Sequence, residues 1–413
     1  MRTRRVFLRD SAMVLAGIGT APMWLARAAA TESRKNKILV AIFMRGAADG
    51  LNIVAPFSDK RYRELRPTLA ISPPSGQNNG TGPQNGSIDL DGTFALHGAM
   101  QPLKALWDKR QFAIVQATGS PDPSRSHFDA QDYMESGSPG RLVSGGWLNR
   151  ALPPAADEVS PMRAVALGTQ VPRTLRGEHE VLALGNSAQF NIPDQETAAI
   201  VNKMYSLTAD APLRRSGKEA FEAMKVIQSI GKSQPNTAPG PNGAQYAQGG
   251  ELGRNLQQLA GLIKANAGVE AAFAEVGGWD HHGNENQQMF NLLRQFSTAV
   301  AAFCQDMGDR MEDIVMVTMS EFGRTAEENG NAGTDHGHGS LMMVCGGPVQ
   351  GGKVYGEWPG LEKEQLYEGR DLAVTTDFRA VLGELVRDHM GQSNLGTVFP
   401  GFQPGHALGL LRS

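Results

Sequence analysis

The apolar positions of the chain gather into short runs, separated by longer segments of mixed polarity. The runs show no strict alternation of apolar and polar residues, which is typical of strands buried on both faces of a sheet. Several of them end at a glycine or a polar cluster, as the first run does at Arg45-Gly46. The runs predict strands at 37–44, 112–117, 163–167, 181–184, 269–276, 314–319 and 340–345.

Helical patterns fill much of the chain between these strands. Strands that alternate with helices favour a three-layer α/β/α sandwich with a mainly parallel central sheet. We expect a single α/β domain over residues 36–413, with loop insertions rich in Gly and Pro near 73–92 and 232–250. The helices are predicted at 102–109, 195–231, 251–266, 286–311 and 378–389.

The first thirty residues, 1–30, have the pattern of an export signal. Thr3-Arg4-Arg5-Val6-Phe7-Leu8-Arg9 matches the twin-arginine motif, a mildly apolar run from 12 to 25 follows, and Ala28-Ala29-Ala30 offers a cleavage site. The run is too short and weak for a membrane span, so we expect no stable span after cleavage. The protein would then be periplasmic or secreted, with the twin-arginine translocase as its partner during export. An uncleaved anchor or a chance basic start is the alternative.

Charge and cysteine content narrow the possible functions. The chain has 413 residues, with 39 Lys and Arg against 42 Asp and Glu and a formal net charge of −3. This near balance removes any global electrostatic case for binding nucleic acid. Two cysteines exclude a disulfide scaffold and a Cys-rich zinc or iron–sulfur module. We expect Cys304 and Cys345 to be free buried thiols, with a disulfide as the alternative.

Clusters of polar residues follow four of the predicted strands, where chemistry is found in parallel α/β sheets. The strongest signals are Asp280-His281-His282 and Asp335-His336-Gly337-His338. Imidazole and carboxylate together suit zinc, manganese or iron, so two such clusters predict a site for one or two metal ions. Ordinary polar loops also contain His and Asp, which is the alternative. The clusters occupy residues 45–52, 120–129, 277–283 and 320–325 with 334–339.

Ser126 permits two interpretations. It can cap a helix that begins at His127, with Asp129 completing a capping box. It can also be a nucleophile, because a helix start favours an anion beside the hydroxyl and a metal can lower the pKa of that hydroxyl. Ser124 is a second candidate for the nucleophile.

Asp49 and two arginines are also ambiguous. Asp49 precedes Gly50 and can be a turn residue, but it also follows the first strand, where a metal ligand is expected. Arg125 and Arg324 are candidates to bind the oxygens of an anionic substrate, against the default of surface charge.

These motifs, in this order, resemble those of a family of bacterial exported proteins called domain of unknown function 1501. The resemblance covers nearly the whole mature chain and implies the alkaline-phosphatase-like fold of sulfatases and phosphomutases. It also implies a site with one or two metal ions that cleaves phosphate or sulfate esters. The matching stretches are 43–52, 119–128, 278–283, 320–325 and 335–339.

The resemblance implies a role for each matching residue. The implied nucleophile is Ser126, and the catalytic candidates around it are Arg125, Arg324 and His127. The sequence departs from the related hydrolases at two points. Glu321-Phe322 replaces a usual Asp-His pair, so a second metal would lack a ligand there. The Asp280–His282 spacing is also shorter than usual. The implied metal ligands are Asp49, Asp280, His282, Glu321, His336 and His338.

We therefore expect an exported metal-dependent hydrolase of phosphate or sulfate esters. Its divalent metal would be zinc, with manganese, calcium or iron as alternatives. Its substrate would be a small anionic ester or a sulfated or phosphorylated glycan. The alternative is a non-catalytic exported protein on the same fold that binds a metal or an anion, or that serves in assembly.

Overall fold

The computed structural model describes residues 37–74, 86–154, 160–185, 200, 203–208, 227 and 241–412. The expected signal segment 1–30 lies outside these residues, as do most of the expected helix at 195–231 and parts of both loop insertions. Among the described residues, no helix has the combination of length and hydropathy that crossing a bilayer requires.

A nine-stranded sheet forms the middle layer of the protein. Its order is β11-β5-β10-β9-β1-β8-β6-β7, and β12 pairs with β5. All seven strands expected from the apolar runs belong to this sheet, and β11 and β12 join it as short additions. The strands are β1 (Ile38–Met44), β5 (Phe112–Gly119), β6 (Ala164–Ala166), β7 (Leu182–Ala183), β8 (Ala271–Val276), β9 (Ile314–Met319), β10 (Ser340–Gly346), β11 (Lys353–Tyr355) and β12 (Thr376–Asp377).

The sheet is mostly parallel, as the sequence predicts, with one reversed strand among those described. β10 pairs antiparallel with both β5 and β9. The remaining strand pairs of the large sheet are parallel. Because β10 is reversed, its first residue lies at the same edge as the last residues of β5 and β9. The chain that precedes β10 therefore reaches the edge where the parallel strands end.

β1 lies near the centre of the sheet and is buried along its whole length. Phe43 packs into the core on one face of the sheet, and Ile42 packs into the core on the other. Successive side chains of a strand point to opposite faces, so a strand covered on both sides needs apolar residues at every position. This explains why the run at 37–44 shows no alternation.

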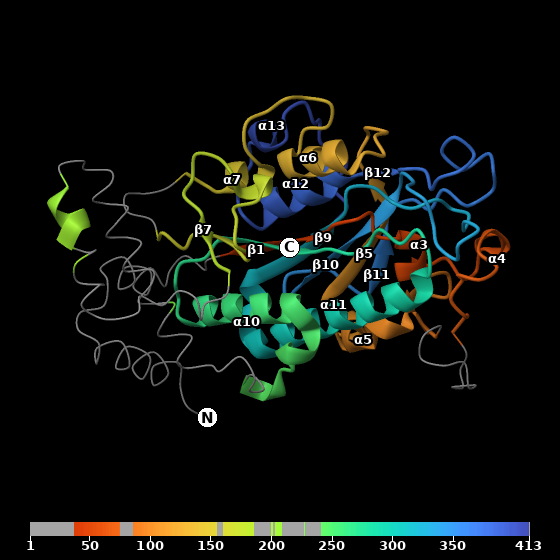
Figure 1. Cartoon of the computed structure of the whole chain (residues 1–413), viewed down its shortest axis with the longest axis horizontal. Helices are drawn as coiled ribbons and strands as arrows, with labels where there is room; N and C mark the ends of the chain where they lie inside the picture. Colours follow the sequence, from red (N-terminus) through yellow and green to blue (C-terminus); the bar gives the residue numbers. More distant parts are fainter. Residues whose placement is uncertain are drawn as a thin grey trace.

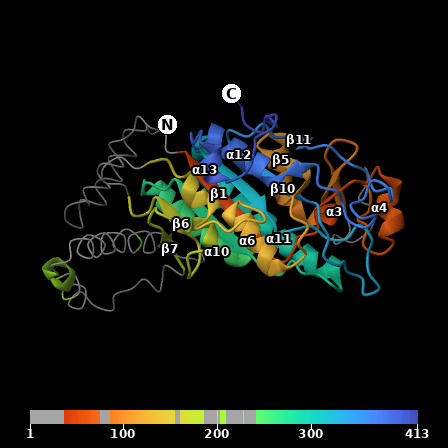
Figure 2. The same cartoon turned by 90° about the horizontal axis from the view of Figure 1, so that it is seen from above.

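Helices cover both faces of the sheet, which confirms the three-layer α/β/α architecture (Figure 1). Both views place α3 (Gly50–Ile53) and α4 (Lys60–Leu65) at one end of the molecule (Figure 2). A small second sheet contains β2 (Val54–Ala55), β4 (Ala95–His97) and β3 (Ser87–Asp89). One layer contains α6 (His127–Ser136), α7 (Trp147–Ala151), α12 (Phe378–Asp388) and α13 (Leu395–Val398), and the other contains α5 (Lys104–Asp108), α10 (Gly250–Lys264) and α11 (Glu285–Met307).

The structure differs from the sequence prediction at the end of α11 and within the segment 73–92. Helix α11 ends at Met307 rather than near 311, because Gly308 takes a left-handed φ of 52° and a 3₁₀ helix follows. Strand β3 lies inside the segment 73–92 that the composition predicts as a loop. Its pairing with β4 is a long-range contact that Gly and Pro content does not reveal.

The two cysteines are free and buried, as the sequence predicts. Cys304 on α11 and Cys345 on β10 place their Sγ atoms 3.6 Å apart. Their contact and their burial raise the pKa of Cys345 well above its ordinary value, so this thiol stays protonated at neutral pH.

Candidate metal centre

Five loop segments meet at one edge of the sheet. Four follow β1, β5, β8 and β9, and the fifth precedes the reversed strand β10. Gly46 lets two of these loops touch, because a Cβ at this position would lie 2.7 Å from the backbone nitrogen of Asp280. Its φ of +117° is a second reason for glycine. The polar clusters singled out in the sequence are therefore neighbours in space.

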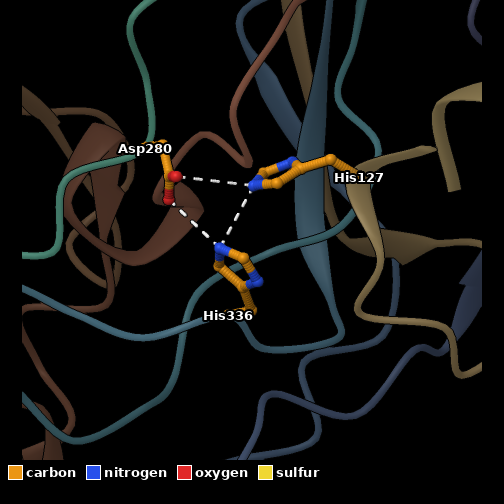
Figure 3. A group of neighbouring side chains, drawn as sticks. All are labelled: His127, Asp280 and His336. Atoms are coloured by element: carbon orange, nitrogen blue, oxygen red, sulfur yellow. Dashed lines mark hydrogen bonds and ion pairs between the residues drawn. The ribbon is translucent and has the colours of Figure 1, made fainter.

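His127, Asp280 and His336 form a group that could hold a metal ion (Figure 3). Their ligand atoms all lie within 4.8 Å of one another. The Nε2 atoms of the two histidines are 3.1 Å apart. Asp280 places Oδ1 3.1 Å from His336 Nε2 and Oδ2 3.5 Å from His127 Nε2. The three residues come from the first turn of α6, the loop after β8 and the loop before β10.

His282 supplies a fourth donor atom beside this group. Its Nε2 lies 3.0 Å from Asp280 Oδ1 and 3.1 Å from His336 Nε2. The short spacing of Asp280 and His282 in the sequence is therefore compatible with both side chains facing one space. Three imidazole nitrogens and one carboxylate make a donor set that suits zinc and other transition metals.

Each of the three imidazoles has an oxygen acceptor on its other nitrogen. The Nδ1 atom of His127 lies 2.8 Å from a carboxylate oxygen of Glu321. His336 Nδ1 lies 3.1 Å from the backbone carbonyl of Arg125, and His282 Nδ1 lies 3.0 Å from a carboxylate oxygen of Asp335. These oxygens only accept hydrogen bonds, so each Nδ1 donates its proton. With this tautomer, each ring in its neutral form would present an Nε2 lone pair to the common space.

This arrangement fits a cation on chemical grounds. In the neutral rings, lone pairs on Nε2 atoms 3.1 Å apart would repel one another, and the Asp280 carboxylate adds negative charge beside them. A metal ion would turn these facing acceptors into ligands, and metal-bound histidines commonly donate their other N–H to such oxygens. The donor set and its partners thus match what a metal site requires.

Glu321 contacts the donor residue His127 through the ring nitrogen that does not face the other donors. Its Oε1 accepts hydrogen bonds from the backbone N–H of Gly46 and the side chain of Gln131, in addition to His127. Burial alone would raise the pKa of Glu321, but the hydrogen bonds from His127 and Gln131 hold it below its ordinary value. In return, the hydrogen bond and charge of Glu321 raise the pKa of His127. The structure gives Glu321 an orienting contact with a donor residue.

Arg324 contacts Asp280 from inside the protein. Its side chain is completely buried, and its Nη1 donates to Asp280 Oδ1 at 2.6 Å. Partial burial opposes ionisation of Asp280, but the hydrogen bond and charge of Arg324 lower the pKa of Asp280 to about 2. Asp280 is therefore an anion at every pH where the protein would meet a metal.

Asp49 lies outside the donor group. Both of its oxygens accept hydrogen bonds from the buried side chain of Arg66, at 2.5 and 3.0 Å. Burial alone would raise the pKa of Asp49, but the charge and hydrogen bonds of Arg66 lower it. Arg66 also donates to the backbone carbonyls of Thr325 and Ala326, which fixes it in place.

The remaining candidates have other contacts. Ser126 caps α6, since its side chain accepts from the backbone N–H of Asp129 at 3.5 Å. Arg125 donates to Asp371 and Glu368, at 2.6 and 2.8 Å. His338 is buried, with its ring 4.4 Å from that of Tyr367, and burial lowers its pKa. The cap interpretation of Ser126 is supported, and its role as a nucleophile stays a prediction.

The sequence motifs imply that His127 is a catalytic residue, whereas the structure places it in the donor group. A His at the first position of a capped helix, in the loop after a core strand, is the signal that could have identified it. Gln131 follows one helical turn later and contacts the same carboxylate. No sequence signal marks Arg66, because its burial depends on distant segments.

The fold and the donor group together define a three-layer α/β protein with a candidate site for a metal ion. A family model described as "Protein of unknown function (DUF1501)" matches residues 36–394. The chain belongs to this family, as its motifs indicate. No curated protein and no solved structure matches the chain.

Loss of a donor residue should abolish tight metal binding. We expect His336→Ala and His282→Ala to weaken binding of Zn²⁺ on the order of 100-fold or more, because each removes one ligand atom. His338→Ala is the matched control from the same loop, and it should keep the affinity of the parent chain. Competition with a chromophoric chelator measures the affinities. Equal affinity in all four proteins would contradict the assignment.

The contact of Glu321 with His127 should set the pH dependence of binding. Metal binding requires neutral His127, and Glu321 raises its pKa, so protons compete at a higher pH than for an ordinary histidine. In Glu321→Gln the loss of affinity on acidification should move to lower pH, while affinity at pH 8 falls about 10- to 100-fold. Titrations between about pH 5 and 9 test this. Glu275→Gln, at an exposed carboxylate bonded to Arg45, should leave the profile unchanged.

Proposed function

We propose that the chain is a metal-dependent hydrolase of phosphate or sulfate esters with an alkaline-phosphatase-like fold. The observation that supports this function is the set of three Nε2 atoms and one carboxylate facing a common space, each held from behind by a hydrogen-bond partner. The site lies at the carboxyl edge of the sheet, where α/β enzymes bind their substrates. A partly exposed donor set also leaves room for a substrate oxygen.

The residues of the site divide the chemistry between them. A divalent cation held by His127, Asp280 and His336 would lower the pKa of a hydroxyl and offset charge on the ester oxygens. Glu321 accepts a hydrogen bond from His127 Nδ1 and so holds the proton on that nitrogen. Arg324 holds Asp280 in its ionised form. In this function the Oγ of Ser126 bonds to phosphorus or sulfur and gives its proton to solvent. The ester P–O or S–O bond breaks, and the leaving alkoxide takes a proton from solvent to become the alcohol. Water then releases phosphate or sulfate from the serine.

Zinc is the metal we propose first. Its usual ligands are imidazole nitrogen and carboxylate oxygen in tetrahedral sets, which matches the donors here. Manganese and iron accept the same ligands, and two histidines with one carboxylate also form the ligand set of many iron sites. Calcium prefers oxygen ligands alone and fits least well.

One observation favours a non-catalytic metal-binding protein as the second candidate. The guanidinium groups of Arg125 and Arg324 both contact carboxylates, so neither is free to bind the oxygens of an ester. A hydrolase would then depend on the metal and on backbone N–H groups to stabilise developing charge. A protein that only stores or senses a metal has no such requirement.

Substitution of Ser126 tests the hydrolase. Ser126→Gly removes the hydroxyl and keeps a residue that caps well, so turnover of an aryl phosphate or aryl sulfate should fall about 1,000-fold or more while folding is hardly altered. Ser124→Ala is the matched control and should retain turnover. If Ser126→Ala costs about 1 kcal/mol of stability and turnover persists, Ser126 is only a cap. If the metal-loaded parent hydrolyses neither ester class, the second candidate becomes the better account.

We also propose export through the twin-arginine pathway, which the motif at residues 3–9 supports. Lysine keeps the charge of the signal but not the arginine pair. The double variant Arg4→Lys with Arg5→Lys should therefore remain in the cytoplasm, as cell fractionation would show. Normal export of this variant would contradict the proposal.

A further inference from the structure

A chain of buried polar contacts runs from Asp280 into the protein, away from the donor atoms. Its first link is Arg324, which donates to Asp280 Oδ1 and whose side chain is 0% exposed. An arginine with this burial cannot exchange its partners for water. Whatever fixes its guanidinium group therefore also fixes the carboxylate in front of it.

Thr334 is the second link and holds the other side of this guanidinium. Arg324 donates through Nε to the hydroxyl of Thr334 at 3.1 Å and through Nη2 to its backbone carbonyl. Thr334 is 0% exposed and lies two residues before the donor His336. Its backbone N–H donates to the carbonyl of His281, beside Asp280, so the residue joins the two loops that carry donors.

Glu285 is the third link and sets the direction of the Thr334 hydroxyl. The hydroxyl donates its single proton to Glu285 Oε2 at 2.7 Å, which leaves its lone pair for Arg324. Glu285 is completely buried at the first position of α11. Helix α11 packs on the sheet over 23 residues, so this end of the chain of contacts has a rigid anchor.

The buried arginines of this region are each paired with a carboxylate. Burial, and next the charge of Asp49, raise the pKa of Glu285 well above its ordinary value, which favours the uncharged form of this side chain. Asp49 is neutralised by Arg66, and Asp280 by Arg324. Arg66 and Arg324 therefore both have a carboxylate partner within the protein.

We propose that Arg324 is a positioning residue for the metal ligand Asp280, and that the hydroxyl of Thr334, oriented by Glu285, holds Arg324 in place. This inference deepens the proposed function, since it concerns the same metal centre, and it rests on metal binding rather than on hydrolysis. The affinity for the metal then depends on a hydroxyl group that never touches it.

The physical reason is the direction of the Asp280 carboxylate. Arg324 takes one lone pair of Oδ1, which turns Oδ2 toward His127 Nε2, 3.5 Å away. With the hydroxyl gone, the guanidinium keeps its bond to the Thr334 carbonyl but can pivot about it. The carboxylate then loses its fixed direction, although every ligand residue is still present.

Thr334→Val tests the inference, because valine has the shape of threonine without its hydroxyl. We expect its affinity for Zn²⁺, measured by competition with a chromophoric chelator, to fall about 10- to 100-fold, as is usual when a partner of a metal ligand is lost. Thr334→Ser restores the hydroxyl and should recover the affinity of the parent chain. Thr118→Val is the matched control, since it removes a buried hydroxyl that bonds only backbone carbonyls.

Thermal unfolding without metal separates positioning from damage to the fold. The inference is supported if Thr334→Val and Thr118→Val unfold at similar temperatures while only Thr334→Val loses affinity. It is overturned if Thr334→Val binds Zn²⁺ like the parent chain, or if Thr334→Ser is as weak as Thr334→Val. A parent chain whose Zn²⁺ affinity depends on the Thr334 hydroxyl but which hydrolyses no ester would refute only the hydrolase. A parent chain that binds no Zn²⁺ would refute this inference and the zinc-dependent hydrolase together.

Discussion

The double burial of β1 is the constraint on which the rest of the structure depends. A strand with no exposed residue needs hydrogen-bonded neighbours on both sides and a helical layer on each face, and β8, β9 and the two core clusters provide them. Parallel neighbours end at the same edge as β1, so their loops meet there. The reversed direction of β10 brings one more loop to that edge. The position of the candidate metal centre follows from the way in which the sheet and its helices enclose the core.

The polar residues at this edge form two groups that differ in exposure: the donor residues and the residues that hold them in place. The side chains of Asp280, His282 and His336 are partly exposed, whereas those of Glu321 and Arg324 behind them are buried. A buried charge is stable only with its partner, so Glu321 and Arg324 cannot change their contacts without a large free-energy cost. The donor side chains that they contact therefore have fixed orientations, although they lie at the surface. Such preorganisation is what a metal site or an active site needs.

Much of the fold could be predicted from the sequence, because strands covered on both faces leave continuous apolar runs. The clusters at 280–282 and 335–338 could be predicted because both lie in loops next to core strands, and such loops carry the chemistry of α/β sheets. The reversal of β10, which brings 335–338 to the same edge, could not be predicted. The pairing of Asp49 with Arg66 could not be predicted. One arginine among many becomes buried only through contacts with the distant residues 325 and 326. The contact of Glu321 with His127 likewise joins loops that are 194 residues apart.

The large sequence separation of the donor residues has a consequence for the stability of the folded protein. His127 and His336 are 209 residues apart in the chain, and Asp280 lies between them. A cation bound to all three would act as a cross-link that closes a very long loop, a site that the unfolded chain lacks. Folded protein would then gain about 1.4 kcal/mol for each tenfold rise of free metal above its Kd. The amount of folded protein would thus report the metal supply of the compartment in which the chain resides.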